Sequence, residues 1–120
     1  MKRILSLALI LALAGAAVRL LADPEITSSV PAKGLEGGDY PAHSKISLEQ
    51  AVKTALKASP KGNKSLSASL TANTHADGTS YLIWDCDTVG KRGDVTAVFI
   101  DPATGKVLGT QREDWAMGEK

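Results

Sequence analysis

Two aspartates flank the single cysteine of the chain in the run Asp85-Cys86-Asp87, which is the densest group of side chains able to bind a metal ion. His75 is the candidate for a third ligand. In an extended strand successive side chains point to opposite faces, so Asp85 and Asp87 share a face while Cys86 points away. Two carboxylates without a fixed third ligand make a weak site for a divalent ion. We therefore interpret both aspartates as solvated strand acids and expect no metal ion or cofactor.

Cys86 is also the one candidate for a nucleophile of the thiol–imidazole type, with His43 or His75 as the base. His43 lies in a stretch rich in proline and glycine, and His75 lies beside a turn. Neither histidine is therefore expected on a rigid helix or strand that would hold its side chain in place. Because catalysis needs a preorganised geometry, we predict that the protein is not an enzyme. The position of Cys86 inside an apolar run favours a buried, inert thiol over an intermolecular disulfide.

The first 22 residues have the pattern of a secretory signal peptide. Lys2 and Arg3 precede an apolar run and then a group of small residues, with cleavage expected after Ala16 or Ala22. The rival interpretation is a membrane anchor, but Arg19 interrupts the run before it reaches the roughly 20 residues that a membrane span needs. We therefore expect an exported protein, periplasmic or extracellular, with no stable membrane span after cleavage.

The charge balance gives no sign of a nucleic-acid partner. The chain has 14 lysines and arginines against 13 aspartates and glutamates. Cleavage after Ala22 would remove three cations and no acid, which leaves 11 against 13 and a net charge of −2. The basic residues are scattered along the sequence, whereas nucleic-acid binding needs a basic footprint. We exclude that class of partner.

The segment 23–44 has the composition of a linker, with prolines, glycines and serines and little apolar periodicity. Too few apolar side chains are present to offset the entropy lost on ordering, so we expect a flexible linker. A single folded domain is predicted over residues 45–115, followed by a short tail over 116–120.

An amphipathic helix is predicted over residues 47–59. Ser47 and Gln50 match a capping box, in which each side chain bonds to the other residue's backbone N–H. The apolar residues that follow recur at helical spacing and form one stripe. These residues are Leu48, Ala51, Val52, Ala55 and Leu56. Pro60 and Gly62 end the helix.

After the helix the apolar period changes to two, which indicates strands. Leu66, Ala68, Leu70 and Ala72 alternate with polar residues, and further strands are predicted over 81–89, 95–100 and 106–110. Short connections make neighbouring strands antiparallel. The predicted fold is α+β, with one N-terminal amphipathic helix packed on a three- to four-stranded antiparallel sheet.

The strand over 81–89 assigns the two faces of this sheet. Its two aspartates mark one face as the wetter one, so Trp84 is expected under the helix and Tyr81 and Ile83 on the outer face. The next strand is apolar on both sides, and Phe99 adds to the apolar surface. We expect Tyr81, Ile83 and Phe99 to contact a partner, because an exposed apolar face usually serves an interaction. Trp115 is expected to cover this face or to cap the core.

A turn with a defined mechanism connects the last two strands in Asp101-Pro102-Ala103-Thr104-Gly105. The Asp101 carboxylate is expected to accept hydrogen bonds from backbone N–H groups just ahead of it. Gly105 supplies the positive φ that returns the chain to a strand.

The order of helix, aromatic strand and Asp-Pro turn resembles the PepSY family over roughly residues 45–115. The resemblance implies a small, cystatin-like α+β module in an exported or membrane-associated bacterial protein. The family includes propeptides of metallopeptidases, which implies binding or inhibition of a peptidase. It implies structural roles for Asp101 and Gly105 and no catalytic residue.

The function predicted from the sequence is an exported, non-enzymatic module that binds a protein partner, with a peptidase as the first candidate. One alternative is a periplasmic protein that binds a small ligand or a metal at the acidic strand of Asp85 and Asp87. A second is a structural envelope protein that self-associates. The sequence leaves the oligomeric state open.

Overall fold

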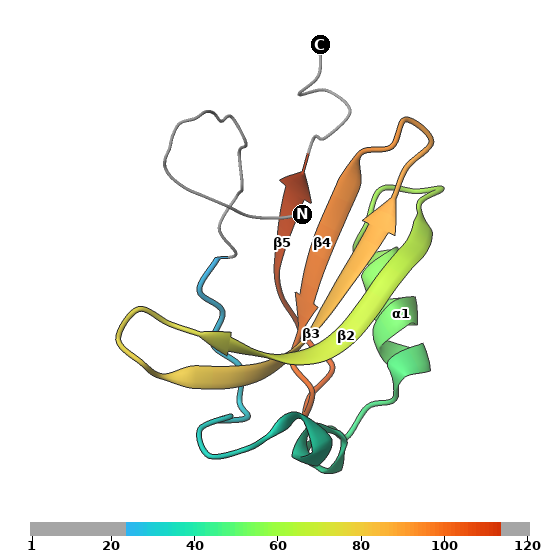
Figure 1. Cartoon of the computed structure of the whole chain (residues 1–120). Helices are drawn as coiled ribbons and strands as arrows, with labels where there is room; N and C mark the ends of the chain where they lie inside the picture. Colours follow the sequence, from blue (N-terminus) through green and yellow to red (C-terminus); the bar gives the residue numbers. More distant parts are fainter. Residues whose placement is uncertain (1–23, 114–120) are drawn as a thin grey trace.

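The computed structural model describes residues 24–113 (Figure 1). A 3₁₀ helix, η1 (Gly37–His43), precedes the α-helix α1 (Leu48–Lys57). Four strands follow: β2 (Lys64–Thr74), β3 (Ser80–Val89), β4 (Val95–Ile100) and β5 (Val107–Glu113). The expected signal peptide with its cleavage sites at Ala16 and Ala22, Trp115 and the tail over 116–120 lie outside the described residues.

The strands form one antiparallel sheet in the order β2-β3-β4-β5, with α1 packed on one face (Figure 1). This confirms the predicted α+β fold. A register shift between Ser65 and Ser67 makes Leu66 a bulge residue, and its side chain is exposed. The alternation of apolar and polar side chains expected for β2 is therefore regular only after Leu66. No helix within residues 24–113 is long and apolar enough to cross a membrane.

Helix α1 begins with the predicted capping box. The Ser47 hydroxyl accepts the N–H of Gln50 at 3.1 Å, and the Gln50 side-chain oxygen accepts the N–H of Ser47 at 2.8 Å. The buried stripe of the helix, Ala51 and Ala55, packs on Trp84 and Cys86 of β3. Trp84 therefore lies under the helix, as the sequence predicts. Small residues on the helix let it approach the large indole closely.

The indole N–H of Trp84 has a hydrogen-bond partner in this core. It donates to the Ser44 hydroxyl at 3.0 Å, and that hydroxyl donates to the carbonyl of Ile46 at 2.8 Å. The Lys45 N–H donates to the carbonyl of Pro102 at 2.8 Å. The chain entering α1 is thereby fastened both to the sheet and to the turn after β4.

The expectation of a flexible linker over residues 23–44 is wrong for its described part. Residues 24–32, here called the strap, lie against the sheet, and their side chains alternate between exposed and buried. The buried members are Ile26, Ser28, Val30 and Ala32. The prolines and glycines of residues 23–44 favour a linker, whereas the period of two within residues 24–32 is typical of a strand-like segment.

The strap crosses the sheet where β4 has ended. The β2–β3 hairpin extends past β4, so the first residues of β3 have a free edge there. Pro31 bridges Tyr81, the Leu82 N–H donates to the carbonyl of Val30 at 2.8 Å, and the Ala32 N–H donates to the carbonyl of Ser80 at 2.9 Å. Figure 1 shows the strap, in blue, crossing this hairpin. Helix α1 precedes every strand, but the strap and η1 also belong to the packed structure.

Candidate functional site

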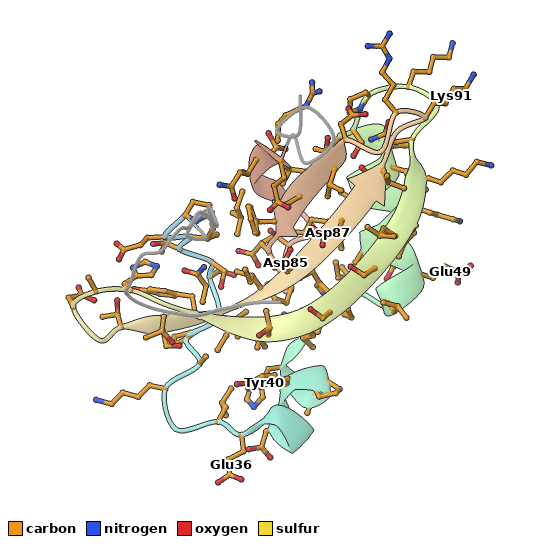
Figure 2. The ribbon with its side chains drawn as sticks, turned by 45° about the horizontal axis from the view of Figure 1, so that its top comes forward. Glu36, Tyr40, Glu49, Asp85, Asp87 and Lys91 are labelled. Atoms are coloured by element: carbon orange, nitrogen blue, oxygen red, sulfur yellow. The ribbon has the colours of Figure 1, made fainter. Side chains whose placement is uncertain are left out.

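The acidic strand does not assemble a metal centre with Cys86. The Cys86 side chain is 1% exposed and packs in the core beneath α1, whereas Asp85 and Asp87 are half-buried on the opposite face of β3 (Figure 2). Asp87 accepts a hydrogen bond from the Ser67 hydroxyl at 3.3 Å. Within residues 24–113, no three His, Cys, Asp or Glu side chains gather in a way that could hold a metal ion.

The thiol of Cys86 is poorly suited to nucleophilic chemistry. Burial, followed by the charges of Asp85 and Asp87, raises its pKa to about 12. A thiol with such a pKa is almost entirely protonated near neutral pH, and the thiolate is the reactive form. Cys86 therefore acts as a small apolar side chain of the core.

The two histidines lie away from this thiol. His43 is the last residue of η1, and its side chain is exposed. His75 lies between β2 and β3, where its Nε2 donates to the carbonyl of Ile26 at 2.8 Å and its ring stacks at a tilt on Tyr81, with centroids 5.1 Å apart. His75 thus holds the strap in place.

The outer face predicted to bind a partner is largely covered by the chain itself. Ile83 and Phe99 are 2% and 1% exposed, because Ile26 of the strap packs on them together with Ala97. Their expected role as exposed contact residues is therefore contradicted. Tyr81 keeps part of its surface. This face is apolar, as the sequence predicts, but it is covered by residues 24–32, which the sequence composition predicts to be part of a linker.

Two buried polar side chains hold the strap by its backbone. Asn73 is 9% exposed; its Oδ1 accepts the Ile26 N–H at 2.9 Å and its Nδ2 donates to the carbonyl of Pro24 at 3.0 Å. Asp101 is 4% exposed and accepts both the N–H and the hydroxyl of Ser29. Sequence reasoning missed Asn73. Its signal would have been a single amide side chain in a strand whose other uncharged polar residues are serines and threonines.

Asp101 also organises the turn in which it lies. Its Oδ1 accepts the N–H of Ala103 at 2.8 Å and of Thr104 at 3.2 Å, and Gly105 follows with φ of 77°. Burial of the carboxyl acts to raise its pKa, but the hydrogen bonds from Ser29, Ala103 and Thr104 outweigh burial and lower the pKa below its usual value. The carboxylate therefore joins the turn and the strap while charged.

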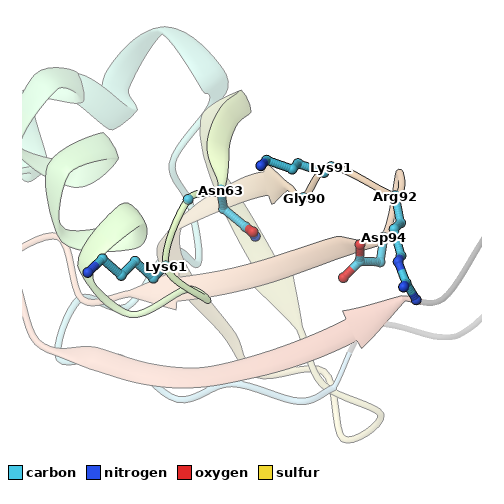
Figure 3. A pocket seen from close by; sticks show the side chains of 7 residues that line it. Lys61, Asn63, Gly90, Lys91, Arg92 and Asp94 are labelled. Carbon is cyan, nitrogen blue, oxygen red and sulfur yellow. The ribbon is translucent and has the colours of Figure 1, made fainter.

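A shallow polar hollow lies at the other end of the sheet, between the α1–β2 and β3–β4 loops (Figure 3). Its volume is about 310 Å³, and it is lined by Lys61, Gly62, Asn63, Gly90, Lys91, Arg92 and Asp94. Lys61 and Arg92 extend away from each other in Figure 3. Asp94 is paired with Arg112 at 3.0 Å. The hollow thus offers polar surface but no converging set of ligands.

These features define a small α+β module in which Cys86, His75 and Asp101 contribute to the packing and hydrogen bonding of the fold. The chain belongs to the PepSY family, described as the peptidase propeptide and YPEB domain, whose model matches residues 45–111. The matched region runs from the start of α1 to β5 and leaves the strap outside. No curated protein and no solved structure matches the chain.

Proposed function

We propose that this chain is a non-catalytic protein-binding module of the PepSY type that acts in the cell envelope on a peptidase. The observation that carries the proposal is the family match over residues 45–111, which covers the helix and most of the sheet. A propeptide is the part of a precursor that contacts its own peptidase. A separate module of this kind would make the same type of contact in trans.

The chemistry of the described side chains agrees with a binding role. The Cys86 thiol is buried with a raised pKa, and the Asp101 carboxylate is occupied by Ser29 and by its own turn. These two side chains, whose pKa values are shifted, therefore serve the fold. Contact with a peptidase would use the exposed surface of the module, of which Tyr81 is the member retained from the predicted contact set.

The test is capture and inhibition of a defined enzyme. The tagged domain is used to isolate peptidases from the envelope fraction of the cell that exports it, and hydrolysis by the isolated enzyme is measured with and without excess domain. We expect saturable inhibition, weakened by Tyr81→Ser and unchanged by the control Thr110→Ser on the exposed side of β5. Failure of the domain to bind or inhibit any envelope peptidase would contradict the proposal.

A further inference from the structure

Strand β2 lies at the edge of the sheet and presents a row of unpaired backbone groups. The His75 N–H donates to the carbonyl of Thr79 at 2.7 Å. From this pair onward, successive residues of β2 alternate between positions that hydrogen-bond to β3 and positions that do not. Ser69, Thr71 and Asn73 then bond to β3, whereas Ala68, Leu70 and Ala72 direct their N–H and C=O groups away from it. Within residues 24–113, no segment pairs with this outer side of β2.

The hydrogen bonds on the β3 edge of the hairpin support this assignment of the outward-facing groups of β2. Ser80 and Leu82 lie across from Thr74 and Ala72, in the pairs that do not bond within the hairpin. Their outward groups are the ones that bond to Ala32 and Val30 of the strap. The strap thus occupies the free edge of β3, and the equivalent edge of β2 is open in the described structure.

Beyond Lys64 and the bulge at Leu66, this open edge lacks the usual protection against pairing with another strand. Proteins guard long edges with charged residues, prolines or bulges. The ten residues from Ser65 to Thr74 include neither a charged residue nor a proline, and the register shift near Leu66 leaves the rest of β2 regular. The other edge strand, β5, is shorter and carries Arg112 and Glu113.

An exposed leucine lies on the same edge strand. The exposed large apolar side chains of the described structure are Leu48 at 53%, Leu66 at 57% and Val107 at 41%. Leu66 is on β2 itself, whereas Leu48 begins α1, which packs on one face of the sheet (Figure 1). Covering this edge would remove apolar surface as well as unpaired backbone groups from water.

We propose that β2 is an interface at which a second copy of this chain pairs antiparallel, β2 against β2, to form a continuous sheet across a two-fold axis. A second copy fits because antiparallel self-pairing is self-complementary. Residues 65–74 of β2 carry no charge and so bring no like charges together, and they place serine and threonine side chains opposite one another, a favourable cross-strand pairing. This proposal does not rest on the proposed action on a peptidase.

The structure provides a specific cross-linking test. Ser69 and Thr71 bond to β3, so across the new interface they would occupy non-hydrogen-bonded positions, where Cβ atoms approach most closely. The variants Ser69→Cys and Thr71→Cys are each tested alone and also mixed with each other. These combinations detect a register that places Ser69 opposite Ser69, Thr71 opposite Thr71, or Ser69 opposite Thr71. Thr110→Cys on the exposed side of β5 is the matched control. The native Cys86 is buried and does not compete.

We expect the wild type to shift from monomer to dimer over about a hundredfold increase in concentration, measured by analytical ultracentrifugation. Under mild oxidation at least one β2 combination should form a disulfide-linked dimer at least about tenfold faster than Thr110→Cys, because pairing raises the local thiol concentration. A wild type that stays monomeric, or equal cross-linking rates in all variants, would overturn the proposal. Preferential cross-linking through Thr110→Cys would overturn it as well.

Discussion

The carboxylate of Asp101 accepts hydrogen bonds from both the backbone N–H and the hydroxyl of Ser29, at 2.8 and 2.9 Å, across 72 residues of sequence. One turn residue therefore joins the β4–β5 connection to the strap. The contact helps to fasten the strap to the fold, because a charged acceptor strengthens the hydrogen bonds that it receives.

Replacing this carboxylate should destabilise the protein. Asp101→Asn keeps the size of the side chain but removes the charge that four donors share. We expect a loss of about 1.5–3 kcal/mol in the free energy of unfolding, measured by urea denaturation. The control Asp94→Asn breaks only the exposed pair with Arg112 and should cost less than about 1 kcal/mol. Equal effects of the two substitutions would contradict the role of Asp101.

The same carboxyl should make stability depend on acid pH. Its pKa is lowered from 3.8 in the folded protein, so its contribution is complete above that pH and is lost as the pH falls through the folded pKa. Unfolding free energies measured from pH 6 downward should therefore decrease less steeply in Asp101→Asn than in the wild type. Parallel curves would show that Asp101 carries no stabilising charge.

The strap should contribute measurably to stability through Ile26, which packs on Ile83 and Phe99. Ile26→Ala is expected to lower the free energy of unfolding by about 2–4 kcal/mol, because it leaves a cavity against the sheet. Thr27→Ala, at the neighbouring exposed position, should change it by no more than about 0.5 kcal/mol. A neutral Ile26→Ala would mean that the strap does not dock in solution.

Cys86 should resist thiol reagents in the folded state. Its side chain is 1% exposed and its pKa is about 12, so labelling by a bulky disulfide reagent at pH 8 should follow unfolding. Between pH 9.0 and about 12 the thiol ionises more readily in the unfolded chain, so stability should fall as the pH rises. Rapid labelling of the native protein at a rate independent of urea would contradict the burial of this thiol.

Gly105 should tolerate substitution less well than a glycine in an ordinary conformation. Its φ is +77°, while a Cβ there would lie 3.6 Å from Ile46 Cγ2, an ordinary contact, so the cost of Gly105→Ala is conformational. We expect a loss of about 1 kcal/mol in thermal or urea unfolding. Gly37→Ala, where φ is ordinary and a Cβ meets open space, is the control and should be close to neutral. A neutral Gly105→Ala would argue against the turn geometry.

The local elements of this protein could be predicted from short stretches of its sequence. Ser47 and Gln50 marked the start of α1, the alternation around Trp84 assigned the faces of β3, and Asp101 with Gly105 marked the last turn. These predictions succeeded because each depends on residues close together in the chain, where capping and side-chain period act directly.

The segment that covers the outer face could not be predicted in this way. Ile26 meets Phe99, and Ser29 meets Asp101, through contacts between residues far apart in sequence, and the prolines and glycines nearby obscured the short alternation of the strap. The open edge of β2 likewise follows from the order of strands in space. Local sequence sets which face of a strand is apolar, but whether that face meets solvent, a partner or the chain itself depends on long-range packing.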